Sequence, residues 1–267
     1  MITILFFLFG IIIGSFLNVV ICRLQTEETL LGRSHCTKCE KRIAWYDNVP
    51  LLSFLILRGK CRNCTDEISW QYPLVEFWTG ILFALVGQFI FSPTDPTSFL
   101  PTIFYLGLFS MLVVIFVHDL LTMYIPMIMI WIALSWTAAY LALSQWLAYS
   151  QSSGMDGIPL VSLPYIFAGV GAGIFFWLLV WVSHETWMGM GDVYLALLVG
   201  LVTGWPGVLW AMTFSFGLGA AGGLTLIALG KKGMKSQVPF APFLVLGVII
   251  VALLPKMFPI LQYVMMF

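Results

Sequence analysis

The stretch ITILFFLFGIIIGSFLNVVIC, residues 2–22, runs for 21 residues without a charged side chain. A helix of about 20 apolar residues is long enough to cross the hydrocarbon core of a bilayer. Arg23 follows this stretch and no basic residue precedes it, so the stretch lacks the basic n-region of a signal peptide. We therefore expect residues 2–22 to be retained as a first transmembrane helix.

The composition of the whole chain has the same character. Of its 267 residues, 61% are apolar and 9% are charged, and the mean hydropathy is +1.00. Soluble globular proteins carry roughly 25% charged residues, so a soluble globule and a disordered chain are both excluded. The formal net charge is zero, which gives nucleic acid no general electrostatic attraction. We expect the partner of this surface to be a lipid bilayer, and no nucleic acid.

Eight apolar runs have about the length of a membrane span. They cover 2–22, 73–91, 99–117, 125–148, 161–183, 187–204, 206–229 and 240–264. We therefore expect an all-α polytopic membrane protein with about eight transmembrane helices. Its predicted parts are a first helix over 1–22, a small loop domain over 23–72 and a seven-helix membrane domain over 73–267.

The placement of positive charge predicts the orientation of the chain. If the N-terminus lies outside, the inner segments are 23–72, 118–124, 184–191 and 230–239. These segments contain eleven of the 12 Lys and Arg residues: Arg23, Arg33, Lys38, Lys41, Arg42, Arg58, Lys60, Arg62, Lys231, Lys232 and Lys235. Because inner loops of membrane proteins are rich in Lys and Arg, we expect the N-terminus outside and the loop domain in the cytosol.

Four cysteines lie in the loop domain as two CxxC pairs, Cys36-Thr37-Lys38-Cys39 and Cys61-Arg62-Asn63-Cys64, with 21 residues between them. This spacing is typical of a zinc ribbon, in which four thiolates hold one tetrahedral Zn2+. A loop of about 50 residues needs such a staple, because it buries too little apolar surface to fold alone. The alternatives are four free thiols or, with the orientation reversed, disulfides. A closed four-cysteine site leaves no open coordination position, so we expect it to be structural.

Two aspartates interrupt the apolar sequence. Asp119 lies at the inner end of the third span, and Asp192 lies in Gly189-Met190-Gly191-Asp192 at the start of the sixth. Only 12 residues separate Asp192 from the end of the apolar stretch at Gly204. Such a stretch is too short to cross a bilayer, so we expect the helix to begin upstream and to carry Asp192 to membrane depth.

Both aspartates approach the inner face of the membrane, from helices that run in opposite directions. Two carboxylates in contact cannot both ionise easily, so one keeps a proton while the other acts as a base, which is the requirement of aspartyl hydrolysis. Gly189 and Gly191 are expected to support such a site by allowing close approach of the backbone. The residues alone leave two alternatives open, namely unrelated interfacial acids and the proton relay of a transporter.

The ordered motifs of the chain resemble those of bacterial type IV prepilin peptidases, which are leader peptidases and N-methyltransferases of the GxGD intramembrane aspartyl protease class. The matching segments are 14–20 (GSFLNVV), 33–36 (RSHC), 45–53 (WYDNVPLLS), 58–64 (RGKCRNC), 72–76 (YPLVE), Asp119 with 125–126 (IP), 189–192 (GMGD) and 239–243 (PFAPF). The resemblance therefore extends almost from end to end of the chain.

The resemblance implies that Asp119 and Asp192 are the catalytic pair, facing the cytosol at the bacterial inner membrane. It implies that the substrates are prepilins and pseudopilins of type IV pili or type II secretion, which lose a short basic leader. It also implies N-methylation of the new N-terminal residue with S-adenosyl-L-methionine, for which Asn18 and Glu76 are the candidate binding residues. Zinc at Cys36, Cys39, Cys61 and Cys64 remains the structural cofactor expected from the spacing.

Three positions depart from the pattern of that family. Tyr194 stands where a lysine is frequent, Ala241 replaces a glycine, and His118 occupies a position that is more often apolar. We expect His118 to be an interfacial side chain and not a third catalytic group. A peptidase without methyltransferase activity, a proton-coupled transporter and a zinc-ribbon scaffold without chemistry remain as alternative functions.

Overall fold

The structure is a computed structural model that describes residues 1–26, 28–29, 32, 34–151, 161–230 and 238–257. Several sequence predictions lie outside these residues. They concern Arg33, Lys231, Lys232 and Lys235, which contributed to the predicted orientation, and the end of the last predicted span over 258–264.

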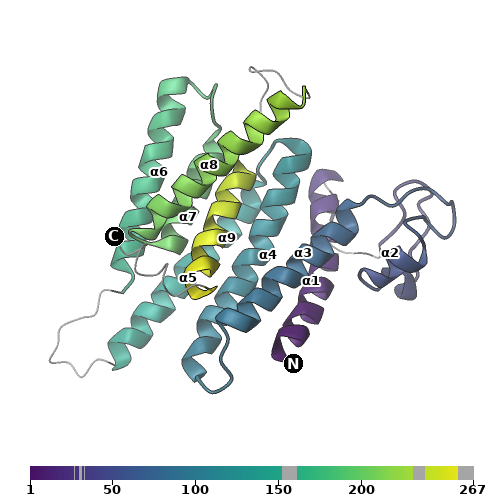
Figure 1. The fold of residues 1–267 in the computed structure, drawn as a ribbon, viewed down its shortest axis with the longest axis horizontal. Coiled ribbons are helices and arrows are strands. Elements are labelled where there is room, and N and C mark those ends of the chain that lie inside the picture. The colour runs from purple at the N-terminus through teal and green to yellow at the C-terminus, as the bar shows by residue number, and fades with distance from the viewer. Residues whose placement is uncertain (27, 30–31, 33, 152–160, 231–237, 258–267) are drawn as a thin grey trace. The chain divides into compact units, whose positions relative to one another are not determined.

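Eight apolar helices are found in the described residues, so the prediction of an all-α fold is confirmed (Figure 1). They are α1 (Ile2–Thr26), α3 (Gln71–Phe89), α4 (Phe99–Thr122), α5 (Met127–Gln151), α6 (Leu163–Ser183), α7 (Met190–Thr203), α8 (Gly207–Ala228) and α9 (Ala241–Met257). Six of them are long and apolar enough to cross a membrane, whereas α7 and α9 have only 14 and 17 residues. The protein is therefore a multi-pass membrane protein in which two of the eight helices are short.

The helix of Asp192 begins upstream of this residue, as expected, but closer to it than the predicted span over 187–204 implies. α7 begins at Met190, two residues before Asp192. Helix α6 ends at Ser183, and His184 and Glu185 both have positive φ angles, 49° and 62°, which reverse the chain. At 1.5 Å per residue, α7 is about 21 Å long, which is less than the ~30 Å of a hydrocarbon core. Asp192 thus lies in the first turn of a short helix.

The chain divides into two compact units, Met1–Val114 and Ile115–Phe267, and each is described by itself. In the first unit, α1 packs along α3. Glycines make this contact close: a Cβ atom added at Gly10 would lie 2.8 Å from the Cα of Gly80, and one added at Gly14 would lie 2.7 Å from the Cα of Glu76. Small residues four apart let two membrane helices approach closely. The predicted domain boundaries after residues 22 and 72 stay predictions.

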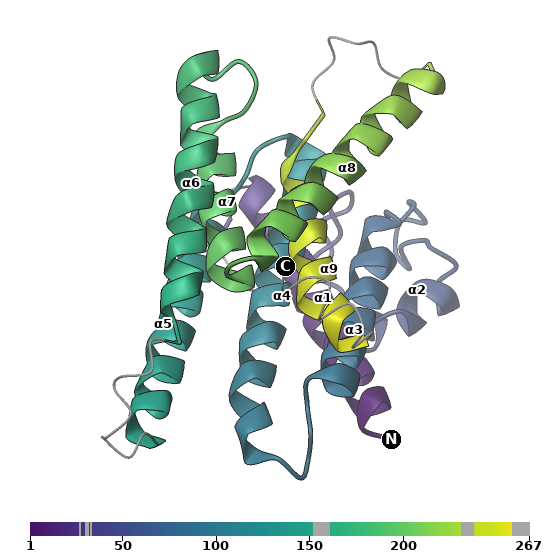
Figure 2. The same ribbon diagram turned by 60° about the vertical axis from the view of Figure 1, so that its left-hand side comes forward.

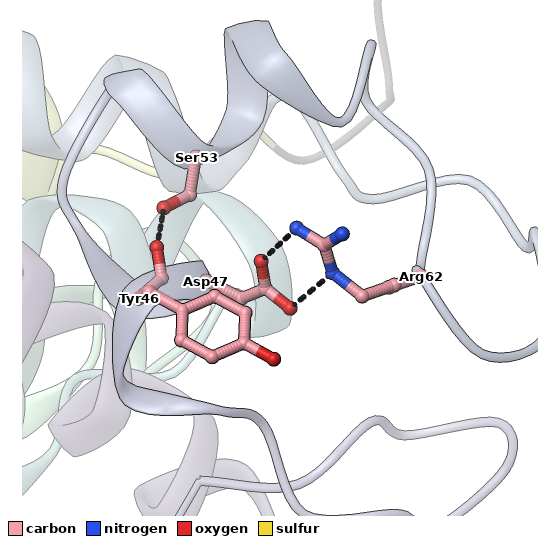
Figure 3. A network of polar contacts seen from close by, with 4 residues as sticks. All are labelled: Tyr46, Asp47, Ser53 and Arg62. Atoms are coloured by element: carbon pink, nitrogen blue, oxygen red, sulfur yellow. Dashed lines mark hydrogen bonds and ion pairs between the residues drawn. The ribbon is translucent and has the colours of Figure 1, made fainter.

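The loop between α1 and α3 carries two short elements, η1 (Trp45–Asn48) and α2 (Leu52–Ile56). Arg62 joins η1 to the second cysteine pair through two hydrogen bonds to Asp47, of 2.8 and 2.6 Å (Figure 3). The guanidinium also lies 5.5 Å from the ring centre of Tyr46, and the Ser53 hydroxyl donates to the Tyr46 carbonyl. The hydrogen bond from Arg62 holds the pKa of Asp47 below its ordinary value. These contacts tie the loop into one folded piece.

In the second unit, α7 packs against α5, α6, α8 and α9. The contact with α6 is the closest, because a Cβ atom added at Gly200 would lie within 2.6 Å of the Gly169 Cα and closer still to the backbone of Ala168. The two helices run side by side in both views (Figure 2). A short helix surrounded in this way presents the residues of its first turn to the neighbouring helix ends.

Candidate functional site

The four cysteines of the loop domain come together as the spacing predicts. Their four Sγ atoms all lie within 4.8 Å of one another, and those of Cys36 and Cys64 are 3.9 Å apart. Zinc–sulfur bonds of ~2.3 Å in a tetrahedron require neighbouring sulfurs to be about 3.8 Å apart. The sulfurs are therefore arranged for one tetrahedral ion, and a structural zinc fits the site.

The two cysteine pairs are built by the same backbone loop. In each pair the amide of the first cysteine bonds to the carbonyl five residues on, and the amide four residues on bonds back to the first cysteine. The bonds are Cys36 N to Lys41 O, Glu40 N to Cys36 O, Cys61 N to Asp66 O and Thr65 N to Cys61 O, of 2.8–3.0 Å. Glu40 and Thr65, which follow the second cysteine of each pair, have nearly equal φ angles of 58° and 59°. The cluster is thus built from two copies of one backbone turn.

Hydrogen bonds within the cluster also separate the acidities of its thiols. The backbone amides of Cys64 and Asn63 lower the pKa of Cys61 to about 7. At Cys64 a backbone hydrogen bond at Asp66 works in the same direction, but burial and the neighbouring thiols outweigh it and raise its pKa to about 12. Without a cation, four thiols at this separation therefore cannot all be ionised.

Asp119 lies near the end of α4, and only 4% of its surface is exposed. Its carboxylate accepts a backbone hydrogen bond from Ala241, the first residue of α9. The amino end of a helix favours a negative group in this position. The second oxygen, Oδ2, is buried and has no hydrogen-bond partner among the residues that the structure describes. A buried carboxylate oxygen that is left unpaired is costly and calls for an explanation.

Asp192 lies in the first turn of α7, where its Oδ2 accepts the amide of Gly189 at 3.2 Å. The Asp192 amide in turn donates to the Gly189 carbonyl at 3.1 Å. The Asp119 carboxylate is near enough to act electrostatically on that of Asp192. The structure therefore brings together the two acids that the sequence singled out, although they lie on separate helices.

The two glycines beside Asp192 are not equivalent. A Cβ atom added at Gly191 would lie 3.1–3.2 Å from side-chain carbons of Ile125, whereas one added at Gly189 meets nothing closer than a backbone nitrogen at 4.0 Å. Gly189 has φ −91° and ψ 167°, a conformation open to any residue. Gly191 is thus tightly packed against the segment that follows Asp119, and a larger residue there would have to displace Ile125, whereas the fold leaves space for a larger residue at 189.

His118, the neighbour of Asp119, is buried with 5% of its surface exposed. Its Nδ1 donates to the Tyr124 carbonyl at 2.8 Å, and it also contacts the Thr122 hydroxyl at 3.1 Å. The turn that it closes contains Met123, whose φ is 54°, and leads directly to Ile125. Sequence reasoning missed this role because the main partner is a backbone oxygen, which leaves no side-chain pattern.

Tyr194, two residues after Asp192, packs on α5. Its ring centre lies 5.2 Å from that of Trp131. The position at which the resemblance leads one to expect a lysine is therefore occupied by an aromatic contact between α7 and α5.

Asn18 and Glu76 form a second buried polar group, in the first unit. Asn18 is 2% exposed and donates from Nδ2 to the Tyr72 carbonyl at 3.0 Å, while its Oδ1 has no partner among the described residues. Glu76 is 7% exposed, and its Oε2 accepts the Leu51 amide at 2.8 Å. Ser15 also bonds to the Glu76 side chain. Sequence reasoning did not predict the contact with Leu51. It joins the Glu76 carboxylate on α3 to a backbone amide of the loop domain, and every residue but proline has such an amide.

The fold and these sites define a multi-pass membrane protein with two acids that are near enough to interact electrostatically and with a four-cysteine cluster. Two family descriptions match its sequence, the bacterial peptidase A24 N-terminal domain over residues 8–89 and the type IV leader peptidase family over residues 106–224. Together they cover most of the chain. The protein belongs to the type IV leader peptidase family.

Named relatives agree with this membership. The prepilin leader peptidase/N-methyltransferase of Myxococcus xanthus is 33% identical and aligns with 86% of this chain and 65% of its own. The protein of the same name from Bacillus subtilis is 30% identical over 91% of each chain. The type 4 prepilin-like proteins leader peptide-processing enzyme of Escherichia coli is 30% identical over 93% of each. This chain thus spans just under two thirds of the Myxococcus relative and nearly all of the other two, and no solved structure matches it.

Proposed function

We propose that this protein removes the short basic leader from type IV prepilins and pseudopilins, and that it then N-methylates the new N-terminal residue. The family membership and the names of the relatives support both activities. Asp119 and Asp192 carry the peptidase reaction in this proposal. The observation on which it depends most is the buried Oδ2 of Asp119, which has no hydrogen-bond partner in the described part of the chain, in a carboxylate that acts electrostatically on Asp192.

The reaction follows from the chemistry of two adjacent carboxyl groups. Repulsion between the negative charges leaves one of them protonated while the other is ionised. The ionised group takes a proton from a water molecule, whose oxygen attacks the scissile carbonyl carbon, and the protonated group gives its proton to the carbonyl oxygen. Collapse of the tetrahedral intermediate breaks the carbon–nitrogen bond, and the departing amine takes up a proton from the pair. The unpaired Oδ2 of Asp119 supplies the free lone pair that these proton transfers need.

The geometry of the helix ends assigns a supporting role to the backbone. Ala241 at the start of α9 holds one oxygen of Asp119, and Gly189 holds one oxygen of Asp192. Each acid is therefore fixed through one oxygen and keeps the other for the reaction. Gly191 supports the site because it lets Ile125 pack against the first turn of α7.

Zinc is the cofactor proposed for Cys36, Cys39, Cys61 and Cys64. When bound, it supplies a cross-link between two turns that are distant in sequence, and it supplies no catalysis, because four thiolates complete its coordination. The separations of the sulfurs fit this role. The free energy of binding such an ion is also folding free energy for a small loop domain.

S-adenosyl-L-methionine is the methyl donor in the proposal, and Asn18 and Glu76 are its proposed binding residues. The donor carries a cationic sulfonium, which makes its methyl group transferable to an amine. The unpaired Oδ1 of Asn18 and the buried carboxylate of Glu76 are acceptors that fit cationic or N–H groups. These residues would bind and orient the donor within the first unit.

The proposed location is the bacterial inner membrane, with the N-terminus outside and the aspartates facing the cytosol. The positive-inside rule supports this orientation. A pilin precursor has a basic leader followed by an apolar helix, so its cleavage site lies at the inner surface of the same membrane. Substrate and aspartates would then meet without drawing a polar peptide into lipid.

The proposal is tested by the intact mass of a prepilin after incubation with the purified protein and S-adenosyl-L-methionine. The unsubstituted protein is expected to release a product that lacks the leader. Its mass should exceed that of the cleaved but unmethylated pilin by one methylene unit. Asp119→Asn and Asp192→Asn should give neither cleavage nor methylation, whereas Glu76→Gln should give cleaved but unmethylated product. Normal cleavage by either aspartate variant would contradict the two-aspartate mechanism. If the unsubstituted protein gave cleaved product without the added methylene, the protein would be a peptidase without methyltransferase activity.

A further inference from the structure

An apolar surface lies on the loop domain, where a purely water-facing domain would carry polar side chains. Leu52, Leu55 and Ile56 of α2 are 57%, 69% and 72% exposed. Residues three and four apart lie on the same side of a helix, so these three side chains form one face, which we call the α2 face. The adjoining side of α2 is turned inward at Ser53, which is buried and bonds to Tyr46. Contiguous exposed apolar side chains of this kind usually mark an interaction surface.

The depth of α2 relative to the membrane span α3 follows from one hydrogen bond. Leu51, the residue before α2, donates its amide to Glu76. Glu76 is the sixth residue of α3, so it lies about 7.5 Å along the helix from Gln71 at 1.5 Å per residue. The ring of Phe54 also contacts that of Trp70, with 5.0 Å between centres. Helix α2 therefore lies beside the first turns of α3 and not beyond its end, as both views show (Figures 1 and 2).

The chemistry around the α2 face matches the surface of a bilayer. The first turns of a membrane span pass through the headgroup region before they reach the hydrocarbon. The first turns of α3 also carry exposed apolar and aromatic side chains, among them Leu74 and Trp78. Arg58 and Lys60 follow α2 directly and are exposed. An apolar helix face flanked by basic residues is the pattern of an interfacial helix that binds anionic lipid.

We propose that the α2 face is a lipid-binding surface that seats the loop domain on the inner leaflet. Leu52, Leu55 and Ile56 enter the boundary between headgroups and acyl chains, and Arg58 and Lys60 contact anionic headgroups. The bilayer thereby holds the loop domain against α3 and keeps the bond between Leu51 and Glu76 shielded from water. The occupant of this surface is lipid and not the apolar helix of a pilin.

The test uses the full-length protein in nanodiscs that contain phosphatidylglycerol. A photo-reactive amino acid is introduced singly at Leu55 or Ile56, and at Asn63 as a matched exposed control on the second cysteine pair. After illumination, intact mass should show adducts of one phospholipid at 55 and 56 and none at 63. Replacing Arg58 and Lys60 with glutamine should lower the adduct yield at 56 severalfold in anionic but not in zwitterionic nanodiscs.

Two further arms keep the proposal falsifiable. The unsubstituted protein, labelled by an apolar carbene reagent dissolved in the bilayer, should be modified within residues 52–56, and this arm does not depend on any variant folding. Adding a prepilin to the nanodiscs should leave the lipid adducts in place. Absence of lipid adducts and of carbene labelling would overturn the proposal, and so would transfer of the cross-link at 55 or 56 to the prepilin.

Discussion

The four cysteines reach one point through two copies of a short backbone loop, whereas Asp119 and Asp192 approach each other from the ends of separate helices. In the cysteine cluster, each turn is defined by local hydrogen bonds, such as those from the amides of Cys36 and Cys61, between residues no more than five apart in sequence. In the aspartate pair, the backbone partner of Asp119 comes from a third helix, α9. The cluster is therefore determined by nearby sequence, and the aspartate pair by tertiary packing.

The two regions differ also in what they leave unsatisfied. The sulfurs of the cluster are arranged so that a single ion completes all of them. The aspartate pair keeps a buried oxygen without a partner, at a cost in stability. A closed set of ligands is typical of a structural site, and an unpaired buried group is typical of a site that binds or transforms something else.

The largest expected effect concerns the aspartate pair. Asp119→Asn and Asp192→Asn should each lower the rate of prepilin cleavage at least ~100-fold, because each removes one partner of a concerted proton transfer. The double variant should be no slower than either single variant, since residues that act as a unit are not additive. Initial rates measured by mass spectrometry would check both statements.

A matched control for these variants is Asp95→Asn. Asp95 caps the turn η2 (Pro96–Ser98) by accepting the Thr97 amide, a role that asparagine also fills. The Asp95→Asn variant should cleave a prepilin at the same rate as the unsubstituted protein. Additive losses in the double aspartate variant would show that Asp119 and Asp192 act separately.

The second expected effect concerns the equivalence of the two cysteine turns. Cys36→Ser and Cys61→Ser should weaken zinc binding by similar factors, each more than ~100-fold, because loss of a direct ligand exceeds the 10–100-fold cost of losing a residue that only supports a ligand. Zinc affinity is measured by competition with a chromophoric chelator. A tenfold or greater difference between the two variants would show that the turns, despite their equal hydrogen bonds, are not equivalent.

A third, intermediate effect separates the two glycines near Asp192. Gly191→Ala should lower the cleavage rate about tenfold, because the added methyl group pushes on Ile125 and small displacements at a reacting centre are costly. Gly189→Ala should change the rate by less than about threefold. Ile125→Val in the Gly191→Ala background should restore part of the loss. An equal loss at Gly189 would instead indicate that the substrate, and not the fold, requires glycine there.

The smallest expected effect lies in the loop domain. Asp47→Asn breaks the ion pair with Arg62, whose side chain is half exposed, so the loss of local stability should be only about 0.5–1 kcal/mol. Native-state proteolysis of the loop at increasing denaturant would measure this difference. Asp66→Asn, which removes an exposed carboxylate that forms no ion pair with any residue the structure describes, serves as the control. A loss several times larger would mean that the network of Figure 3 organises the metal site itself.

The parts of the protein that sequence could predict are those that depend on neighbouring residues. Apolar runs located all eight helices, because burial in lipid acts on every residue of a span. The CxxC spacing predicted the cysteine cluster, because each turn is complete within a few residues. Asp119 and Asp192 stood out because a charge in apolar sequence is costly.

The parts that sequence could not predict depend on backbone atoms and on chain reversals. The chain reversal at His184 and Glu185 is followed by a start of α7 at Met190, three residues after the start of the predicted apolar span at 187. The bond from His118 to the Tyr124 carbonyl and that from the Leu51 amide to Glu76 use backbone partners, which every residue possesses. A residue pattern therefore carries no sign of either contact.

We propose that peptide cleavage resides in the aspartate pair and that the cysteine cluster is structural. The most direct test measures zinc content and prepilin cleavage side by side in Asp192→Asn and in the double variant Cys61→Ser, Cys64→Ser. We expect Asp192→Asn to keep a full complement of zinc and to lose cleavage. The cysteine variant should lose zinc and still cleave faster than Asp192→Asn. Cleavage at the normal rate by Asp192→Asn, or loss of its zinc together with its activity, would contradict this assignment of roles.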